Sequence, residues 1–152
     1  SLPESIKDKP KKYIELEKAF LTAMKSRDEV SRYILLYYMF ELMYDTVEYK
    51  NLTENYKQPN KTSGVSDEND KCRKSNKKRS ELLYQYLQQA FGIIEYSHFD
   101  QTYKLDPEIL FKIIMVRNDL AHRADKTNVN AIMYDHMLPI LQQVFNNIEA
   151  QV

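Results

Sequence analysis

The sequence predicts an all-α domain, and two observations carry that prediction. Only 2 of the 152 residues are glycine, whereas folds built from strands and tight turns depend on glycine. Apolar side chains recur at spacings of three and four residues in several separate stretches, which is the period of one helix face. We therefore expect about five helices in an elaborated antiparallel four-helix bundle, formed by residues 1–152 as a single domain.

The first two helices are expected at residues 10–26 and 29–50. Asp28 or Ser31 can cap the start of the second helix, because their side-chain oxygens can accept from free backbone N–H groups. The middle of that helix, residues 33–40, is apolar on every side. We therefore expect the core to cover one side of it and another helix or a second subunit to cover the other.

Residues 51–79 are expected to form one long, mobile, polar loop, because apolar residues follow no period there. A third helix is expected from Ser80, as its N-cap, to about Tyr96, with Gly92 inside it. A short connection through His98 then leads to the fourth helix.

The fourth helix has the strongest start signal in the chain. Asp106 is expected at the N-cap, Pro107 at the first helical position and Glu108 in the first turn, and the helix should end near Arg123. A last helix follows over 129–148, and its internal proline should kink or divide it.

Charge and composition exclude several kinds of function. Lys plus Arg and Asp plus Glu are both 22, so no global basic field attracts nucleic acid and any such site must be local. The single cysteine, Cys72, excludes an intrachain disulfide and favours a reducing, cytoplasmic location. No apolar run approaches the ~20 residues of a membrane span. His98 and His136 are isolated and lack ligand spacing, so we expect no metal and no cofactor. The chain begins at a serine, which suggests a trimmed chain or an excised domain.

The stretch richest in chemistry is Arg117-Asn118-Asp119-Leu120-Ala121-His122, at the end of the fourth expected helix. Asn118 and His122 are four residues apart and share a face, whereas Arg117 lies about 140° around the axis from His122. One chain therefore does not bring Arg117 and His122 together, but a two-fold axis places the same residues on both sides of an interface. We expect a composite site across a homodimer.

Such a site suits metal-free cleavage of RNA, in which the 2′-hydroxyl attacks the neighbouring phosphate. His122 is the candidate for moving protons, because imidazole titrates near neutral pH. Arg117 is the candidate for holding the phosphate through its planar fork of donors, and Asn118 for orienting the histidine or the ribose. The alternative is a structural pair at a helix end.

This hexapeptide resembles the R-N-x-x-x-H signature of the HEPN superfamily (higher eukaryotes and prokaryotes nucleotide-binding domains), and the family's helical bundle matches residues 10–150. The resemblance implies a homodimeric, metal-independent endoribonuclease acting on RNA, with Arg117 and His122 catalytic and Asn118 supporting. Such domains are toxins of toxin–antitoxin pairs, abortive-infection proteins or CRISPR-associated effectors, so an antitoxin or an effector complex is the expected partner.

The sequence departs from one branch of the family, in which a tyrosine two residues after the histidine is modified by a partner nucleotidyltransferase. Ala124 stands there, so regulation by that modification is not expected. Some HEPN domains are not nucleases. The alternative function is therefore a non-catalytic module that binds nucleotides or proteins within a larger assembly.

Basic residues at the end of the expected loop are candidates for RNA contact, because Lys and Arg neutralise phosphates. A charge run that is only solvated is the alternative, and the acidic stretch before it can also mask it. The 12 tyrosines are expected in core or interface packing more than in base stacking. The candidate RNA-binding residues are Lys71, Arg73, Lys74, Lys77, Lys78 and Arg79, together with Arg123 beside the motif.

Overall fold

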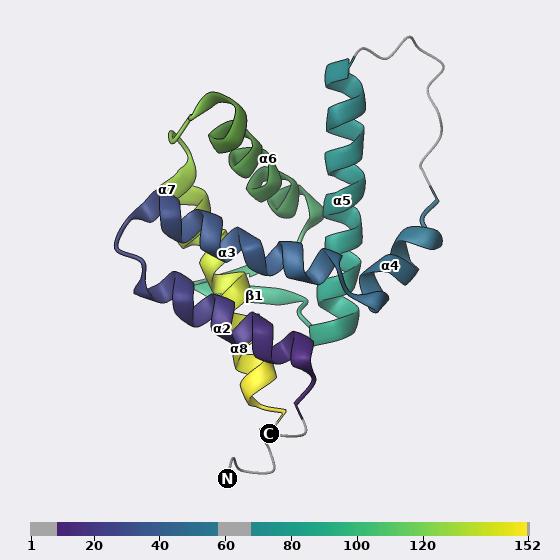
Figure 1. Cartoon of the computed structure of the whole chain (residues 1–152), viewed down its shortest axis with the longest axis vertical. Coiled ribbons are helices and arrows are strands. Elements are labelled where there is room, and N and C mark those ends of the chain that lie inside the picture. The colour runs from purple at the N-terminus through teal and green to yellow at the C-terminus, as the bar shows by residue number, and fades with distance from the viewer. Residues whose placement is uncertain (1–8, 58–67, 152) are drawn as a thin grey trace.

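The computed structural model describes residues 9–57 and 68–151, and within them the chain is mostly helical, as predicted (Figure 1). One small two-stranded sheet interrupts the helices. No helix of the described residues combines the length and the apolar content that crossing a bilayer requires. The elements are α2 (Lys11–Lys25), α3 (Glu29–Tyr44), α4 (Val47–Glu54), α5 (Glu68–Phe91), β1 (Glu95–His98), β2 (Gln101–Lys104), α6 (Pro107–Arg123), α7 (Val129–Ile132), a π-helical turn (Met133–Met137) and α8 (Leu138–Glu149).

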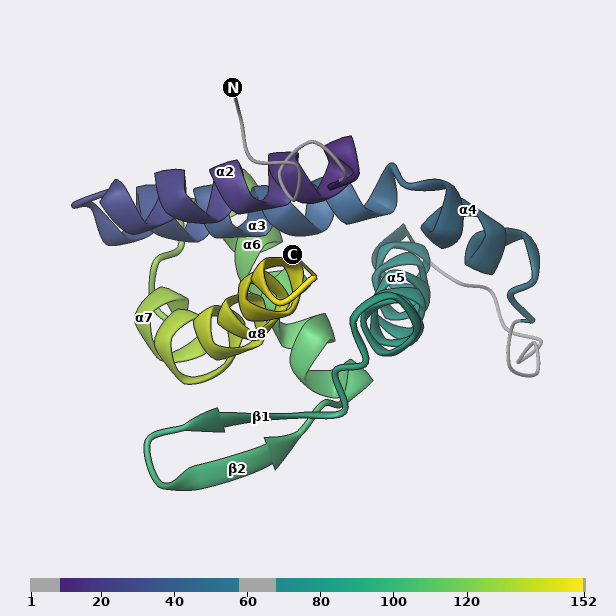
Figure 2. The same cartoon turned by 90° about the horizontal axis from the view of Figure 1, so that it is seen from below.

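The helix α3 packs against α2, α4, α6, α7 and α8. It runs antiparallel to α2 along one side of the molecule, the β-hairpin lies on the opposite side, and α5, α6 and α8 lie between them (Figure 2). Six residues of α3 are buried, and the tyrosines among them confirm the expected packing role: Tyr33, Leu36, Tyr37, Met39, Phe40 and Met43. However, Ile34 and Tyr38 are 52% and 48% exposed, so the described part of one chain covers α3 incompletely.

Two predicted N-caps are confirmed. The Asp28 carboxylate accepts from the backbone N–H of Ser31 at 2.8 Å, and the Asp106 carboxylate accepts from that of Glu108 at 2.8 Å. These bonds satisfy donors that the first helical turn leaves free. The helix α6 ends at Arg123, as predicted, because the next residue, Ala124, adopts a left-handed conformation with φ of 50°.

The predicted helix over 29–50 is wrong in its second half, because the chain breaks at Asp45 and Thr46. The Thr46 hydroxyl donates to the Met43 carbonyl at 2.7 Å and accepts from the Tyr49 N–H at 3.2 Å. A single threonine therefore ends α3 and caps α4. Its hydroxyl competes with the backbone for the hydrogen bonds that would continue one helix.

The prediction of one loop over 51–79 is also wrong, because α4 extends to Glu54 and α5 begins at Glu68; residues 58–67 lie outside the described residues. Ser80 is not an N-cap but lies buried inside α5, where its hydroxyl donates to the Lys77 carbonyl at 2.7 Å. The first half of α5 packs through polar and basic side chains, so it lacks the apolar period that identifies a helix in a sequence.

The predicted extension of the third helix to residue 96 is wrong, because Gly92 ends α5 with φ of 64°. A left-handed glycine is the usual stop for a helix. The predicted connection after it is an antiparallel hairpin in which Tyr96 pairs with Tyr103. The last helix is divided, as predicted, with Pro139 in the first turn of α8, directly after the π-helical turn.

Candidate functional site

The predicted motif occupies the last two turns of α6. Arg117 and Asn118 are half-buried there, whereas His122 and Arg123 are exposed. Because the segment is regular α-helix, Arg117 and His122 point about 140° apart. The motif residues therefore share one end of α6 but do not converge within one chain.

Arg117 is anchored to α3. Its guanidinium carbon lies 5.7 Å from the centroid of the Tyr37 ring, and its Nη2 lies 3.8 Å from Oε1 of Glu41. The side chains of Arg117 and Glu41 remain 41% and 46% exposed. Such an exposed ion pair contributes little stability, so the arginine lies against α3 but remains accessible to a ligand.

An open groove of about 240 Å³ lies beside Arg117, between α3 and the end of α6. Its walls are largely apolar, with Arg117, Glu41 and Lys126 as the charged members. A concave apolar surface with a few charged groups is the usual form of a binding site. The remaining lining residues are Val30, Ile34, Tyr37, Leu120, Ala121 and Ala124.

The predicted RNA-binding residues lie on a helix, because Lys71, Arg73, Lys74, Lys77, Lys78 and Arg79 all belong to α5. All of them are exposed except Lys78, which is half-buried. Four of these cations lie near aromatic rings: Arg73 and Lys77 are each 6.0 Å from the Phe111 ring, Lys78 is 5.3 Å from Tyr56, and Arg79 is 5.3 Å from Tyr44. These aromatic partners were not predicted, because they come from α3, α6 and the segment after α4.

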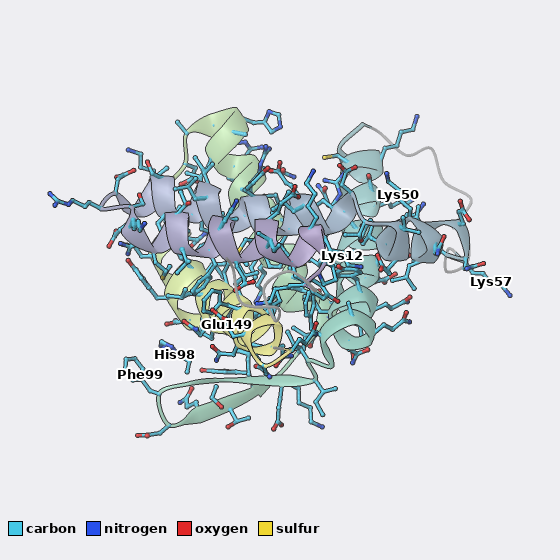
Figure 3. All side chains as sticks on the ribbon, turned by 60° about the horizontal axis from the view of Figure 1, so that its bottom comes forward. Lys12, Lys50, Lys57, His98, Phe99 and Glu149 are labelled. Carbon is cyan, nitrogen blue, oxygen red and sulfur yellow. The ribbon has the colours of Figure 1, made fainter. Side chains whose placement is uncertain are left out.

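A second polar cluster joins the hairpin to the π-helical turn. The Tyr96 hydroxyl lies 2.7 Å from Nδ1 of His136, and Nε2 of His98 lies 3.2 Å from Oδ1 of Asp135. Figure 3 shows His98 beside Phe99 at the hairpin. The hairpin, which was not predicted, therefore brings His98 to Asp135, the residue next to His136.

Burial lowers the pKa of His136 below its ordinary value. Lys112 and His98 add to this effect by repulsion, whereas Asp135 opposes it. The neutral imidazole is therefore favoured, and it can accept the hydrogen bond of the Tyr96 hydroxyl. Within the part of the chain that the structure describes, no group of three or more potential metal ligands is found.

Comparison with known proteins adds no relative to this picture. No protein-family model, curated protein or solved structure matches the chain. The resemblance to HEPN domains therefore rests on the residues of α6 and on the helical class.

Proposed function

We propose that this chain is a metal-independent endoribonuclease of the HEPN type, which cleaves single-stranded RNA at a site shared by two copies. The observation that carries the proposal is the placement of Arg117. Its guanidinium is held by α3 beside an open groove, and the same end of α6 carries the exposed His122.

The chemistry requires one phosphate holder and a pair of proton carriers. The 2′-oxygen forms a bond to phosphorus while the bond from phosphorus to the 5′-oxygen breaks, which leaves a 2′,3′-cyclic phosphate and a 5′-hydroxyl. His122 of one copy accepts the proton of the 2′-hydroxyl, and water donates a proton to the 5′-oxygen. Arg117 stabilises the charge that develops on the phosphate, and Asn118 orients the imidazole or the ribose.

The incomplete cover of α3 supports the second copy. Ile34 lines the groove beside Arg117 and is half exposed, as is Tyr38 one turn further along α3. Burying such side chains is worth roughly 25 cal/mol per Å², so a second subunit gains free energy where it would also complete the site. We further propose that the helices form an elaborated four-helix bundle, and that the protein acts in the cytoplasm in a toxin–antitoxin, phage-defence or CRISPR setting, with an antitoxin or an effector complex as partner.

The test is incubation of single-stranded RNA with the protein in EDTA. Wild type should cleave, whereas Arg117→Ala and His122→Ala should each lose at least about a hundredfold in rate. Lys112→Ala is the matched control for the arginine, because it removes an exposed cation of α6 outside the motif, and His98→Ala is the control for the histidine. If folded wild type cleaves no RNA, or cleaves it no faster than the folded variants, the proposal is wrong.

One observation favours the second candidate function, a non-catalytic binding module. An arginine held between Tyr37 and Glu41 has the surroundings of a residue that ties α6 to α3. In that case Arg117→Ala lowers the free energy of unfolding and changes no chemistry, whereas His122→Ala leaves the exposed end of α6 intact. The same assay separates the two functions, because only a nuclease loses activity on substitution of the exposed histidine.

A further inference from the structure

One face of α3 connects the groove beside Arg117 with a second cationic groove. Tyr37 and Tyr44 are seven residues apart, so they share that face, and their hydroxyl oxygens are 3.4 Å apart. Arg117 lies over the Tyr37 ring, and Arg79 of α5 lies over the Tyr44 ring. Two arginines from different helices therefore lie over neighbouring tyrosines of one α3 face, whose hydroxyl groups meet.

The second groove lies between α4 and α5 and has a volume of about 250 Å³. Its polar lining has the composition that a phosphate and an adjoining nucleoside require, with positive charges, hydroxyl groups and aromatic faces. These residues are the cations Lys78 and Arg79, the hydroxyl residues Thr53 and Ser75, and the tyrosines Tyr44 and Tyr49.

The charge of this groove is not neutralised by the described residues. No carboxylate lines the groove, and among residues 9–57 and 71–151 none forms an ion pair with Lys78 or Arg79. The Glu81 carboxylate, one turn along α5, instead accepts from the Tyr56 hydroxyl at 2.5 Å. The two cations are therefore available to an anion from solution.

The rings also hold the cations in place. Lys78 lies 5.3 Å from the centroid of the Tyr56 ring and Arg79 lies 5.3 Å from that of Tyr44, so an aromatic ring restrains each cation. Preorganised cations lose less conformational entropy on binding than free lysine and arginine side chains do. Single-strand binding surfaces combine cations of this kind with aromatic side chains.

We propose that the groove between α4 and α5 is a second contact for the RNA strand, in which Lys78 and Arg79 hold a backbone phosphate upstream or downstream of the one held by Arg117. This inference rests on the proposed function for the identity of the strand. The groove therefore adds binding energy for a strand that contacts Arg117 and the groove together.

The test uses fluorescently labelled oligouridine of eight nucleotides with 2′-O-methyl groups, which cannot be cleaved by 2′-hydroxyl attack. Binding is followed by anisotropy between 50 and 200 mM salt, as a chosen range around physiological strength. The double variant Lys78→Gln/Arg79→Gln should bind about tenfold more weakly at the lowest salt, and its plot of log K against log salt should be flatter by about 1.4, or ~0.7 for each charge. Each single variant should bind about threefold more weakly than wild type and flatten the plot by about 0.7.

Two controls define the result. Lys25→Gln removes a charge at the end of α2, which lies at the opposite end of α3 from α4 (Figure 1), and should bind within about twofold of wild type. Circular dichroism and thermal unfolding identify any variant that has lost its fold, and the exposed Arg79→Gln alone then serves as the test.

The outcomes separate this inference from the proposed function. Wild-type affinity and salt dependence in the folded double variant overturn the groove, as does an eight-nucleotide probe that does not bind wild type. If the double variant binds the probe more weakly but wild type cleaves no RNA, the groove is supported and the nuclease proposal is wrong. If wild type cleaves RNA and the double variant has the same KM, the nuclease proposal is supported and the groove proposal is wrong.

Discussion

Glu41 is the residue that limits the charge of Arg117. Its carboxylate lies 3.8 Å from the guanidinium, and both side chains are close to half exposed. We expect Glu41→Gln to bind single-stranded RNA more tightly and to cleave it faster, because a phosphate no longer competes with a carboxylate for the arginine. The free energy of unfolding should change by less than about 0.5 kcal/mol.

The measurement is the affinity for the 2′-O-methyl probe together with kcat/KM on cleavable RNA. Glu15→Gln is the matched control, because Glu15 pairs with Lys11 on the surface of α2. Weaker binding by Glu41→Gln than by wild type would mean that the carboxylate orients Arg117 rather than restraining it.

Tyr33 ties α3 to α6 beneath the motif. Its side chain is fully buried, burial raises its pKa, and its hydroxyl donates to the Ile113 carbonyl. We expect Tyr33→Phe to lower the free energy of unfolding by about 1 kcal/mol, the usual net value of a buried hydrogen bond. Urea unfolding checks this against Tyr38→Phe, in which the half-exposed ring should tolerate the change; an equal loss in both variants would contradict the account.

At this scale the sequence was informative about chemistry but not about neighbours. The identities of Arg117, Asn118 and His122 and their separation around α6 follow from helix geometry. The partners of Arg117, namely Tyr37 and Glu41, are about 80 residues away in the sequence, and no spacing rule predicts a contact between α3 and α6.

At the scale of elements, a substitution of Gly92 tests where α5 ends, because the change in the free energy of unfolding has opposite signs inside a helix and at its end. Inside a helix, Gly92→Ala would be stabilising by 0.5–1 kcal/mol, roughly the helix propensity difference. With φ of 64° the same substitution should instead destabilise by about 1 kcal/mol, although the added Cβ meets nothing within 4 Å.

Gly92→Asn should be milder than Gly92→Ala, because asparagine tolerates the left-handed conformation better. Urea unfolding of the two variants beside wild type measures both effects. A stabilised alanine variant would show that α5 continues through this position and that the hairpin begins later.

The junction between the hairpin and the π-helical turn should make stability depend on pH. The pKa of His136 is lower in the folded protein than in the unfolded chain, so the unfolded chain binds more protons as the pH falls. The contribution of His136 is therefore fully present above its unfolded pKa, near 6.5, and is lost as the pH falls through the lower folded value.

We expect the free energy of unfolding to decrease between about pH 7 and pH 5, and His136→Gln to remove part of that decrease because the amide does not titrate. Urea titrations at several pH values give the difference between the two proteins, which isolates this residue from other ionisable groups. Parallel curves for wild type and variant would rule out His136 as a source of the dependence.

Elements could be predicted where a local signal exists. Asp28 and Asp106 identified two helix starts because a cap bonds within its own turn. The basic half of α5 was missed because Lys and Arg side chains pack there against Phe111 and other rings, contacts that leave no apolar period. The hairpin was missed because its strands are four residues each, too short for alternation to identify.

At the scale of the whole molecule, the cations form an arrangement that the balanced net charge conceals. Arg117 on α6 and Arg79 on α5 lie along one face of α3, and two open grooves adjoin them. The sequence predicted that any nucleic-acid site must be local and that α3 is apolar on every side, but not that the two coincide, because that depends on how α3, α5 and α6 pack together.

The central claim is that Arg117 and His122 act from different copies of the chain. It is tested most directly by mixing Arg117→Ala with His122→Ala, two variants that are each expected to be inactive, and measuring RNA cleavage in EDTA. If the site is shared, heterodimers contain one site with both residues intact, so the mixture should recover up to about a quarter of wild-type activity when subunits exchange at random. A mixture that exchanges subunits, as sedimentation and labelled chains would show, but stays as inactive as its components would contradict the account.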